Sequence, residues 1–315
     1  MSDTSAIEWT DATWNIVTGC HKLKQGCKNC FAEREWARLS APREKPNVYT
    51  GRAFTDVACH PERLVLPVLW RKPRRVFVTS MGDPFHKDVP TEFIDKTFAV
   101  MRRARDHTFQ LLTKRTERMA EYFQDPDLPY RVAKAGLEVE LCGMESIPRF
   151  PLPNVWLGFS AEDQETFNER WEPLCGEAFA GWPLWLSAEP LLGHVNASAA
   201  MPNELFSNLA SWQGGELKWV VAGGESGPKA RPSHPDWFRS LRDQCQAAGV
   251  PFFFKQWGEW REDWGAIQDL GLRDETQIPG NGYAKIEGYT AEFYRPGKRK
   301  AGRLLDGRTW DEFPQ

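Results

Sequence analysis

The sequence predicts an α/β fold, specifically a TIM-like partial (β/α) barrel of parallel strands with a C-terminal cap or tail. Short apolar runs recur at intervals of roughly 30 to 35 residues, the length of a strand followed by a crossover helix. These runs are apolar throughout rather than alternating, as expected for parallel strands that are covered on both faces. A glycine-rich turn, which a dinucleotide-binding sheet would carry after its first strand, is missing, and cysteines occupy that place.

Seven apolar runs are the expected strands, each bounded by polar residues or by Gly and Pro. Two stretches between them, residues 90–106 and 234–249, have the apolar spacing of amphipathic helices. The second ends at Gly249, a residue type that commonly terminates a helix. The expected strands are residues 14–20, 75–80, 108–114, 154–161, 183–190, 218–226 and 250–258.

The chain divides into a barrel and a tail. Residues 1–260 carry the repeat of strands and helices, and a segment at about residues 124–153 interrupts this repeat as an insertion would. Residues 261–315 no longer follow the repeat and are rich in Gly, Asp and Arg. We expect them to form the C-terminal cap or tail.

Composition argues against several classes of protein. The net charge of −3, from 40 Lys and Arg against 43 Asp and Glu, argues against a nucleic-acid binder that is basic overall. Two local basic segments, residues 71–75 and 298–303, are candidates for phosphate contacts. Because the sequence has no apolar run of about 18 residues and no signal-like start, we expect a cytoplasmic protein without membrane segments. Most of the 15 Trp residues are expected in the core.

Three of the seven cysteines lie close together near the N-terminus. Cys20, Cys27 and Cys30 have the spacing C-x6-C-x2-C in the segment GCHKLKQGCKNCFAE. Three thiolates on one loop can bind three irons of a 4Fe–4S cluster and leave the fourth iron open for another ligand. Zinc is the main alternative, but it usually takes four protein ligands, and the sequence offers no second cysteine pair. Unligated thiols are the third interpretation.

Polar or ionisable side chains follow every expected strand. In a parallel barrel the functional site lies at the carboxyl ends of the strands, where the βα loops meet. Helix capping explains some of these residues. It does not explain three glutamates, Glu162, Glu189 and Glu225, that each follow an apolar run.

The segments that carry these residues resemble those of a phage-associated family of radical-SAM-like proteins, where SAM is S-adenosylmethionine. The resemblance extends from about Ile7 to Pro314 and rests on WTDATWNIVTGCHKLKQGCKNCFAE, RVFVTSMGDPFHKDVP, NVWLGFSAED, LWLSAEPLLG, VVAGGESGPKARP and GVPFFFKQWG. It implies a barrel of the radical SAM type, a 4Fe–4S cluster on Cys20, Cys27 and Cys30, and SAM bound at the open iron. The wider superfamily usually has C-x3-C-x2-C, whereas six residues separate the first two cysteines here.

The resemblance also assigns residues to SAM. A motif after the second strand corresponds to the one that binds the amino group, with its aspartate as the acceptor. Polar residues after the fourth strand are assigned to the ribose or the carboxylate, and a glycine pair lets the backbone approach the adenine. The assigned residues are Ser80, Met81, Gly82 and Asp83 for the amino group, Ser160 and Glu162 for the ribose or carboxylate, and Gly223, Gly224 and Glu225 for the adenine.

The remaining strand-end residues are candidates for the substrate side of the site. Lys114, Arg115, Arg231 and Gln256 are expected to bind substrate. Lys255, Glu189 and His86 are expected to be catalytic.

The reaction that the resemblance implies is reductive cleavage of SAM to a 5′-deoxyadenosyl radical, which abstracts hydrogen from a substrate. A flavodoxin- or ferredoxin-like reductant would supply the electron. The phage association points to a nucleotide or a hypermodified DNA base that is isomerised or rearranged, and a base inside a duplex would have to flip out. Two alternatives stay open: a zinc-containing nucleic-acid-binding barrel, and a TIM-barrel hydrolase that uses Asp83, Glu162, Glu189 and Glu225.

Overall fold

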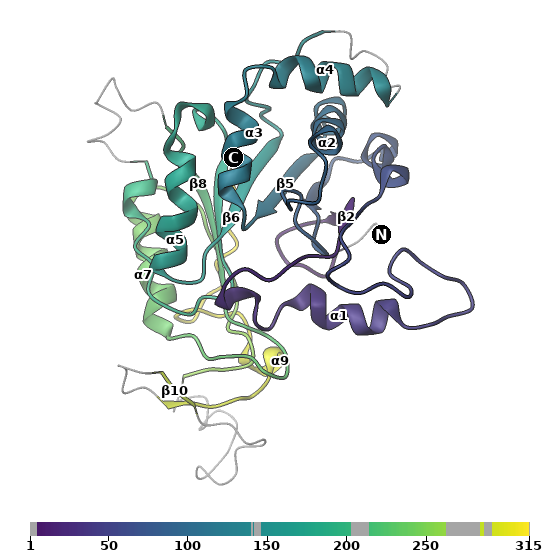
Figure 1. Ribbon diagram of the computed structural model, residues 1–315. Coiled ribbons are helices and arrows are strands. Elements are labelled where there is room, and N and C mark those ends of the chain that lie inside the picture. Colours follow the sequence, from purple (N-terminus) through teal and green to yellow (C-terminus); the bar gives the residue numbers. More distant parts are fainter. Residues whose placement is uncertain are drawn as a thin grey trace.

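A curled sheet of seven parallel strands forms a half-barrel in the computed structural model, which describes residues 5–139, 141, 146–202, 214–262, 284–286 and 292–314 (Figure 1). The strand order is β1-β4-β5-β6-β7-β8-β9, and every pairing within this sheet is parallel. The predicted partial barrel is therefore confirmed. The strands are β1 (Ala12–Trp14), β4 (Arg75–Val78), β5 (Thr108–Thr113), β6 (Val155–Ser160), β7 (Leu184–Ala188), β8 (Leu217–Gly223) and β9 (Phe252–Gln256).

Helices cover the outer face of the sheet, as crossover connections between parallel strands require (Figure 1). Both predicted amphipathic helices form, and the second is followed by Gly249 with a φ of +65°. A further helix, α1, follows the cysteines. The helices are α1 (Phe31–Ser40), α2 (Thr91–Arg103), α3 (Thr116–Gln124), α4 (Leu128–Glu138), α5 (Gln164–Trp171), α7 (Pro235–Ala247) and α9 (Lys298–Ala301).

The first strand differs from the prediction. Residues 14–20 were expected to form it, but β1 ends at Trp14, and β2 (Val17–Thr18) instead pairs antiparallel with β3 (Ala58–Cys59). The physical reason is a tight turn, in which the amide of Ile16 donates to the carbonyl of Trp14 at 3.2 Å. This turn takes the chain out of the sheet and towards the cysteines.

The two faces of the sheet have different cores. Side chains such as Leu157, Phe159 and Leu186 pack against the helices, whereas alternate residues on the inner face form a separate aromatic cluster. In this cluster the ring centroids of Trp9 and Trp185 lie 5.3 Å apart. Ser187 follows further along β7, and Glu189, just beyond the end of this strand, lies 3.4 Å from the Ser187 hydroxyl. The barrel interior therefore changes from aromatic to polar towards its carboxyl end. The aromatic cluster comprises Trp9, Phe77, Trp185, Trp219, Val221 and Phe253.

The C-terminal residues lie along the free edge of the sheet. The amide of Phe254 in β9 donates to the carbonyl of Trp310 at 2.9 Å, and Phe253 forms an antiparallel bridge with Asp311. Trp310 itself is buried. The described part of the predicted tail therefore protects an edge strand, and much of the remainder, residues 263–283 and 287–291, lies outside the described residues.

The predicted insertion at 124–153 contains α4, which packs against α2. Residues 140 and 142–145 of this segment are outside the described part of the chain. Among the residues that the structure describes, no helix is long and apolar enough to cross a membrane.

Candidate functional site

The three cysteines lie on one segment, residues 20–30, which we call the cysteine loop. It passes across the carboxyl ends of the strands (Figure 1). Arg115, after β5, donates from Nη2 to the carbonyl of His21 at 3.2 Å. Arg231, after β8, donates from Nη2 to the carbonyl of Gln25 at 3.0 Å. Since β5 and β8 are separated by two strands, these bonds fix the loop across the mouth of the half-barrel.

Two glycines let the cysteine loop lie this close to its surroundings. Gly19 has a φ of +89°, and a Cβ there would meet the carbonyl oxygen of Asp56 at 2.4 Å. At Gly26 a Cβ would lie 2.0 Å from Oε1 of Glu162. Any larger residue at either position would therefore displace the loop.

The cysteines are partly exposed, and none forms a disulfide. Burial, assisted by the Asp83 carboxylate, raises the pKa of Cys20 to about 12, and the thiolates of Cys27 and Cys30 act in the same direction. Burial also raises the pKa of Cys30, although amide groups of Ala32 and Glu33 in the first turn of α1 hydrogen-bond its sulfur and oppose that rise. Burial thus disfavours the thiolate forms of Cys20 and Cys30 in the protein without a bound cation.

The cysteines are not arranged for a single ion. Among the described residues, the only group of three or more potential ligand atoms within 4.8 Å of one another is formed by His21, His86 and Asp88. A four-iron cluster has no such requirement, because each thiolate binds a different iron. The three cysteines do not form such a group among the described residues, and a cluster bound by them stays a prediction.

Asp83 holds together the ends of β4 and β5. Its Oδ1 accepts from Thr113 Oγ1 at 2.7 Å and from the amide of Phe85 at 2.9 Å. Its Oδ2 accepts from the amide of Lys114 at 3.1 Å and from Arg115 Nη1 at 3.2 Å. Each oxygen of Asp83 thus already accepts two hydrogen bonds within the chain, and a bond to the SAM ammonium stays a prediction.

The other residues of the Ser80–Asp83 motif are also engaged. Ser80 Oγ donates to Asn15 Oδ1 at 3.1 Å, and Met81 packs with Ala32 and Trp36 of α1. A Cβ on Gly82 would lie 3.0 Å from the carbonyl oxygen of Gly19. In this structure the motif therefore supports the entry to the cysteine loop.

Glu162, after β6, is fully buried and bridges two cations. It pairs with Lys114, and its Oε2 lies 3.0 Å from Arg170 Nη1 in α5. Arg170 also binds the backbone carbonyl of Ser160, which is itself buried. The carboxylate therefore lies under Gly26 of the cysteine loop in a fixed position.

Glu225, after β8, pairs with Arg231 at 2.7 Å and accepts from Asn29 Nδ2 at 3.0 Å. Although burial opposes it, these hydrogen bonds lower the pKa of Glu225 below its usual value. The preceding glycines have structural reasons to be glycine. A Cβ on Gly224 would meet the carbonyl oxygen of Trp257 at 1.8 Å, and one on Gly223 would meet Glu189 Oε1 at 2.9 Å. Their contact with adenine stays a prediction.

Lys255 and Glu189 form an ion pair of 2.9 Å on the inner face of the half-barrel. Ser187 Oγ also approaches Glu189, at 3.4 Å. Gln256, the next residue of β9, is buried, and its amide contacts the carbonyl of Gly224 at 3.5 Å. The register between β8 and β9 shifts here, so that Gly223 pairs with Gln256 and Lys255 is an extra residue. The structure thus brings Lys255 and Glu189 together, and substrate binding by Gln256 stays a prediction.

His86 is fully buried, and burial together with Arg115 lowers its pKa to about 4. The amide of Asp88 donates to His86 Nδ1 at 3.2 Å, which leaves the proton on Nε2, 2.9 Å from His21 Nδ1. The two rings are stacked. His86 is therefore a neutral side chain that positions His21, and a catalytic role stays a prediction.

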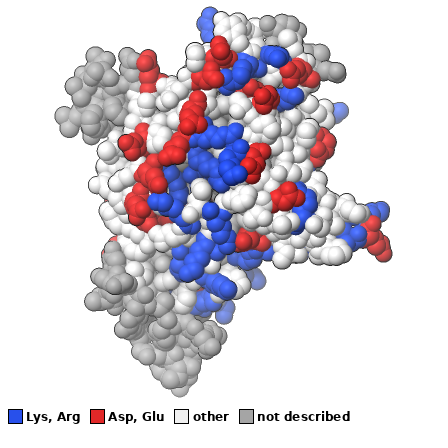
Figure 2. Space-filling model, viewed as in Figure 1, with Lys and Arg blue, Asp and Glu red and all other residues white. Residues whose placement is uncertain are grey.

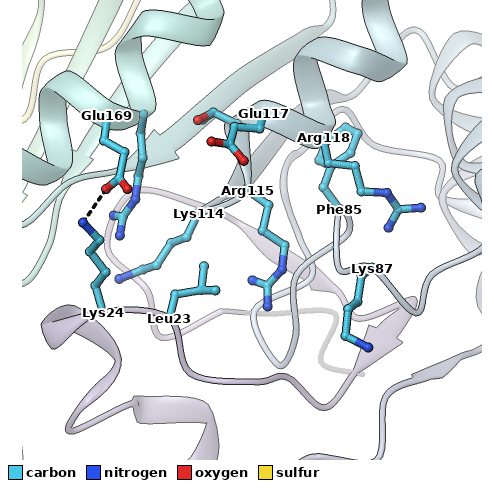
Figure 3. A pocket seen from close by; sticks show the side chains of 11 residues that line it. Leu23, Lys24, Phe85, Lys87, Lys114, Arg115, Glu117, Arg118 and Glu169 are labelled. Atoms are coloured by element: carbon cyan, nitrogen blue, oxygen red, sulfur yellow. Dashed lines mark ion pairs between the residues drawn. The ribbon is translucent and has the colours of Figure 1, made fainter.

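A pocket of about 340 Å³ opens beside the cysteine loop, and Figure 3 shows the side chains around it. Its wall comes from the cysteine loop, the β4–α2 loop, the start of α3, and α5. Cations predominate, with Lys24, Lys114 and Arg115 near Leu23 (Figure 3). The lining residues are Leu23, Lys24, Phe85, Lys87, Lys114, Arg115, Thr116, Glu117, Arg118, Glu169 and Arg170.

Several residues of the pocket and of the cysteine loop were not predicted as site residues from the sequence. Asn29 and Gly26 lie between the cysteines and could have been noticed for their small or polar side chains. Arg118 and Arg170 lie on helices, where a charged residue is ordinarily solvent-exposed. Nothing in the sequence marks them as part of the site.

The whole of this arrangement falls within one family. The family model described as "Protein of unknown function (DUF5131)" matches residues 4–314. No curated protein and no solved structure matches the chain. Because the match covers almost every residue of the barrel and of the described tail, the chain belongs to the DUF5131 family.

Proposed function

We propose that this protein is a radical-SAM-like enzyme in which Cys20, Cys27 and Cys30 bind a 4Fe–4S cluster and SAM occupies its fourth iron. The observation that carries the proposal is the place of the cysteine loop. It crosses the carboxyl ends of the strands and is hydrogen-bonded to the loops after β5 and β8. Reactive groups of β/α barrels collect at this edge, whereas a purely structural metal loop has no reason to lie there.

When bound, the cluster supplies the electron, received from a flavodoxin- or ferredoxin-like reductant, that cleaves SAM to methionine and a 5′-deoxyadenosyl radical. The chain's own residues hold the loop and shape the space beneath it. Arg115, Arg231 and Asn29 fix the loop, and the aromatic cluster closes the amino end of the barrel. Lys255 and Glu189, on the inner face at the carboxyl end, are the groups we assign to the substrate, a phage nucleotide or a hypermodified DNA base.

The hydrolase alternative is less consistent with the contacts. It needs at least one carboxyl group free to act as an acid or a base. All four candidates are engaged in ion pairs: Asp83 with Arg115, Glu162 with Lys114 and Arg170, Glu189 with Lys255, and Glu225 with Arg231.

The proposal is tested by reconstituting the full-length protein with iron and sulfide in the absence of oxygen. We expect about four irons per chain, as a 4Fe–4S cluster requires, and release of 5′-deoxyadenosine when SAM and a reductant are added. Cys20→Ala, Cys27→Ala and Cys30→Ala should each lose both. Cys175→Ala is the matched control, because Cys175 is also partly exposed but lies beyond α5. Zinc at one per chain, or cleavage that survives Cys20→Ala, would refute the proposal.

A further inference from the structure

We propose that the pocket beside the cysteine loop binds a phosphate group of the substrate. This inference rests on the proposed function, because it gives a chemical class to the molecule on which that site acts. Six cationic side chains line the pocket, against two carboxylates, Glu117 and Glu169. The cations are Lys24, Lys87, Lys114, Arg115, Arg118 and Arg170.

The positive charge of the pocket results from the fold rather than from composition. The chain as a whole has a net charge of −3. Figure 2 shows Lys and Arg side chains gathered in the middle of one face, with Asp and Glu in a band along one side. Cations from four separate segments therefore converge on one small volume, where their fields add.

Five of the six cations already have a carboxylate partner. Lys24 pairs with Glu165 and Glu169, Lys87 pairs with Asp88, and Arg115 pairs with Asp83. The single carboxylate of Glu162 is shared by Lys114 and Arg170. Arg118 has no carboxylate partner among the described residues, since its guanidinium binds only the backbone carbonyls of His86 and Val89. An anion would supply the counter-charge that Arg118 lacks, and guanidinium groups bind phosphate oxygens with two parallel hydrogen bonds.

The guanidinium groups are held in place before any ligand arrives. Arg118 Nη2 donates to the carbonyl of Val89 at 2.6 Å. Arg115 bridges Asp83 and the carbonyl of His21, at 3.2 Å in each case. Side chains that are already ordered lose little conformational entropy on binding, so a phosphate would be bound at small cost.

The pocket is also next to the proposed cluster and of suitable size. Lys114 lines it and pairs with Glu162, whose Oε1 would lie 2.0 Å from a Cβ on Gly26 of the cysteine loop. Leu23 of the cysteine loop, 49% exposed, provides an apolar wall. A volume of about 340 Å³ lies at the lower end of the range for small-ligand sites and accommodates a phosphate with part of a sugar.

The basic segment 71–75, a candidate for phosphate contacts from the sequence, does not lie at this pocket. Residues 71–74 immediately precede β4, and Arg75 is its first residue. They therefore lie at the amino end of the sheet, opposite the cysteine loop.

Calorimetric titration of the full-length protein tests the inference without iron or SAM. The probes are thymidine 5′-monophosphate, thymidine, inorganic phosphate and a single-stranded thymidine oligonucleotide. We expect the monophosphate to bind about tenfold or more tightly than thymidine, because one charge-assisted contact contributes at least about 1.4 kcal/mol. Its affinity should fall as salt is raised. Equal affinities for the two would overturn the inference.

Variants locate the binding. Arg118→Gln should lower the affinity for thymidine 5′-monophosphate about tenfold. Lys87→Ala should lower this affinity by a smaller factor. Because the Lys87 side chain is 76% exposed, the substitution should not affect folding. Lys134→Ala, 79% exposed on α4, is the matched control and should have no effect. If Lys134→Ala weakens binding as much as the pocket variants do, the attraction is non-specific and the inference fails.

The source of the phosphate is read from the same titrations. An oligonucleotide that binds more tightly than the monophosphate, with a steeper dependence on salt, identifies a nucleic-acid strand. Equal affinities identify a free nucleotide. Phosphate binding by a protein that assembles no cluster would support this inference and refute the proposed function. A protein that assembles the cluster but does not bind the phosphate would refute this inference and leave the proposed function intact.

Discussion

Asn29 and Glu225 are 196 residues apart in the sequence and are joined by a hydrogen bond of 3.0 Å from Nδ2 to Oε2. Asn29 lies between two of the three clustered cysteines, and Glu225 follows β8. Because Glu225 also receives three hydrogen bonds from Arg231, the position of the cysteine loop depends on a preorganised ion pair across the mouth of the barrel.

Replacing this carboxylate should loosen the loop. In Glu225→Gln the amide cannot satisfy Asn29 and Arg231 together, and a buried hydrogen bond to a charged group contributes about 1.5–3 kcal/mol. We expect the unfolding free energy to fall by about 2 kcal/mol in urea titrations, and iron to be lost faster to a chelator. Glu216→Gln removes a carboxylate from a more exposed pair with Lys218 and should change neither quantity.

The same carboxylate predicts a dependence of stability on pH. The pKa of Glu225 is lower in the folded protein, so its contribution is complete above the unfolded pKa of about 4.3 and is lost as pH falls through the folded value. Urea titrations from pH 7 to pH 3 should therefore show a smaller acid-induced loss of stability in Glu225→Gln than in the parent protein. Parallel curves for the two proteins would contradict this account of Glu225.

Gly26→Ala should displace the cysteine loop. Its Cβ would lie 2.0 Å from Glu162 Oε1, and Glu162 cannot move freely because Lys114 and Arg170 hold it. Overpacking of this kind costs about 1–3 kcal/mol, so we expect lower stability and reduced iron content after reconstitution. Gly176→Ala is the control, since only one side-chain atom lies within 4 Å of its Cβ position, at 3.9 Å.

Lys255→Met should leave Glu189 as a partly buried carboxylate without its cation. We expect the unfolding free energy at pH 7 to fall by about 1–3 kcal/mol. Combining it with Glu189→Gln should recover part of that loss, because the unpaired charge is then removed. A double-mutant cycle in urea measures the coupling. Strictly additive effects would show that the ion pair does not stabilise the inner face.

Trp310→Ala tests the role of the C-terminal segment. Trp310 is buried against the β9 edge, and replacing a buried Trp with Ala typically costs about 3–5 kcal/mol. Leu304→Ala, at a side chain that is 49% exposed, should cost much less. The midpoints of thermal unfolding of the two variants test this role. If the C-terminal segment covers the edge of the sheet, only Trp310→Ala should unfold at a much lower temperature. If the segment is dispensable, both variants should unfold at the temperature of the parent protein.

The strands and helices could be predicted from the sequence, because the spacing of apolar residues along the chain is a local property. It failed at residues 15–20, where a single turn after Trp14 removes the chain from the sheet. It also could not show which distant groups contact Glu162 and Arg231, since these approach only after folding. Lys114 is 48 residues from Glu162 in the sequence. Arg231 and the carbonyl of Gln25, for example, are 206 residues apart.

Strand ends could be located from the sequence, but the face on which each side chain lies was less certain. Lys255 and Gln256 were both assigned to the site, and the register shift between β8 and β9 at this point interrupts the simple alternation of side chains that the sequence would predict. The cationic pocket could not be predicted at all, because it combines residues from two loops and two helices whose charges look like ordinary surface residues in the sequence.

The central claim is that Cys20, Cys27 and Cys30 hold a cluster with an iron open to SAM. The most direct measurement is the EPR spectrum of the reconstituted, reduced full-length protein with and without SAM. The account predicts a reduced-cluster signal that changes when SAM is added and is absent in Cys27→Ala. A signal that SAM leaves unchanged, or one that persists in Cys27→Ala, would contradict it.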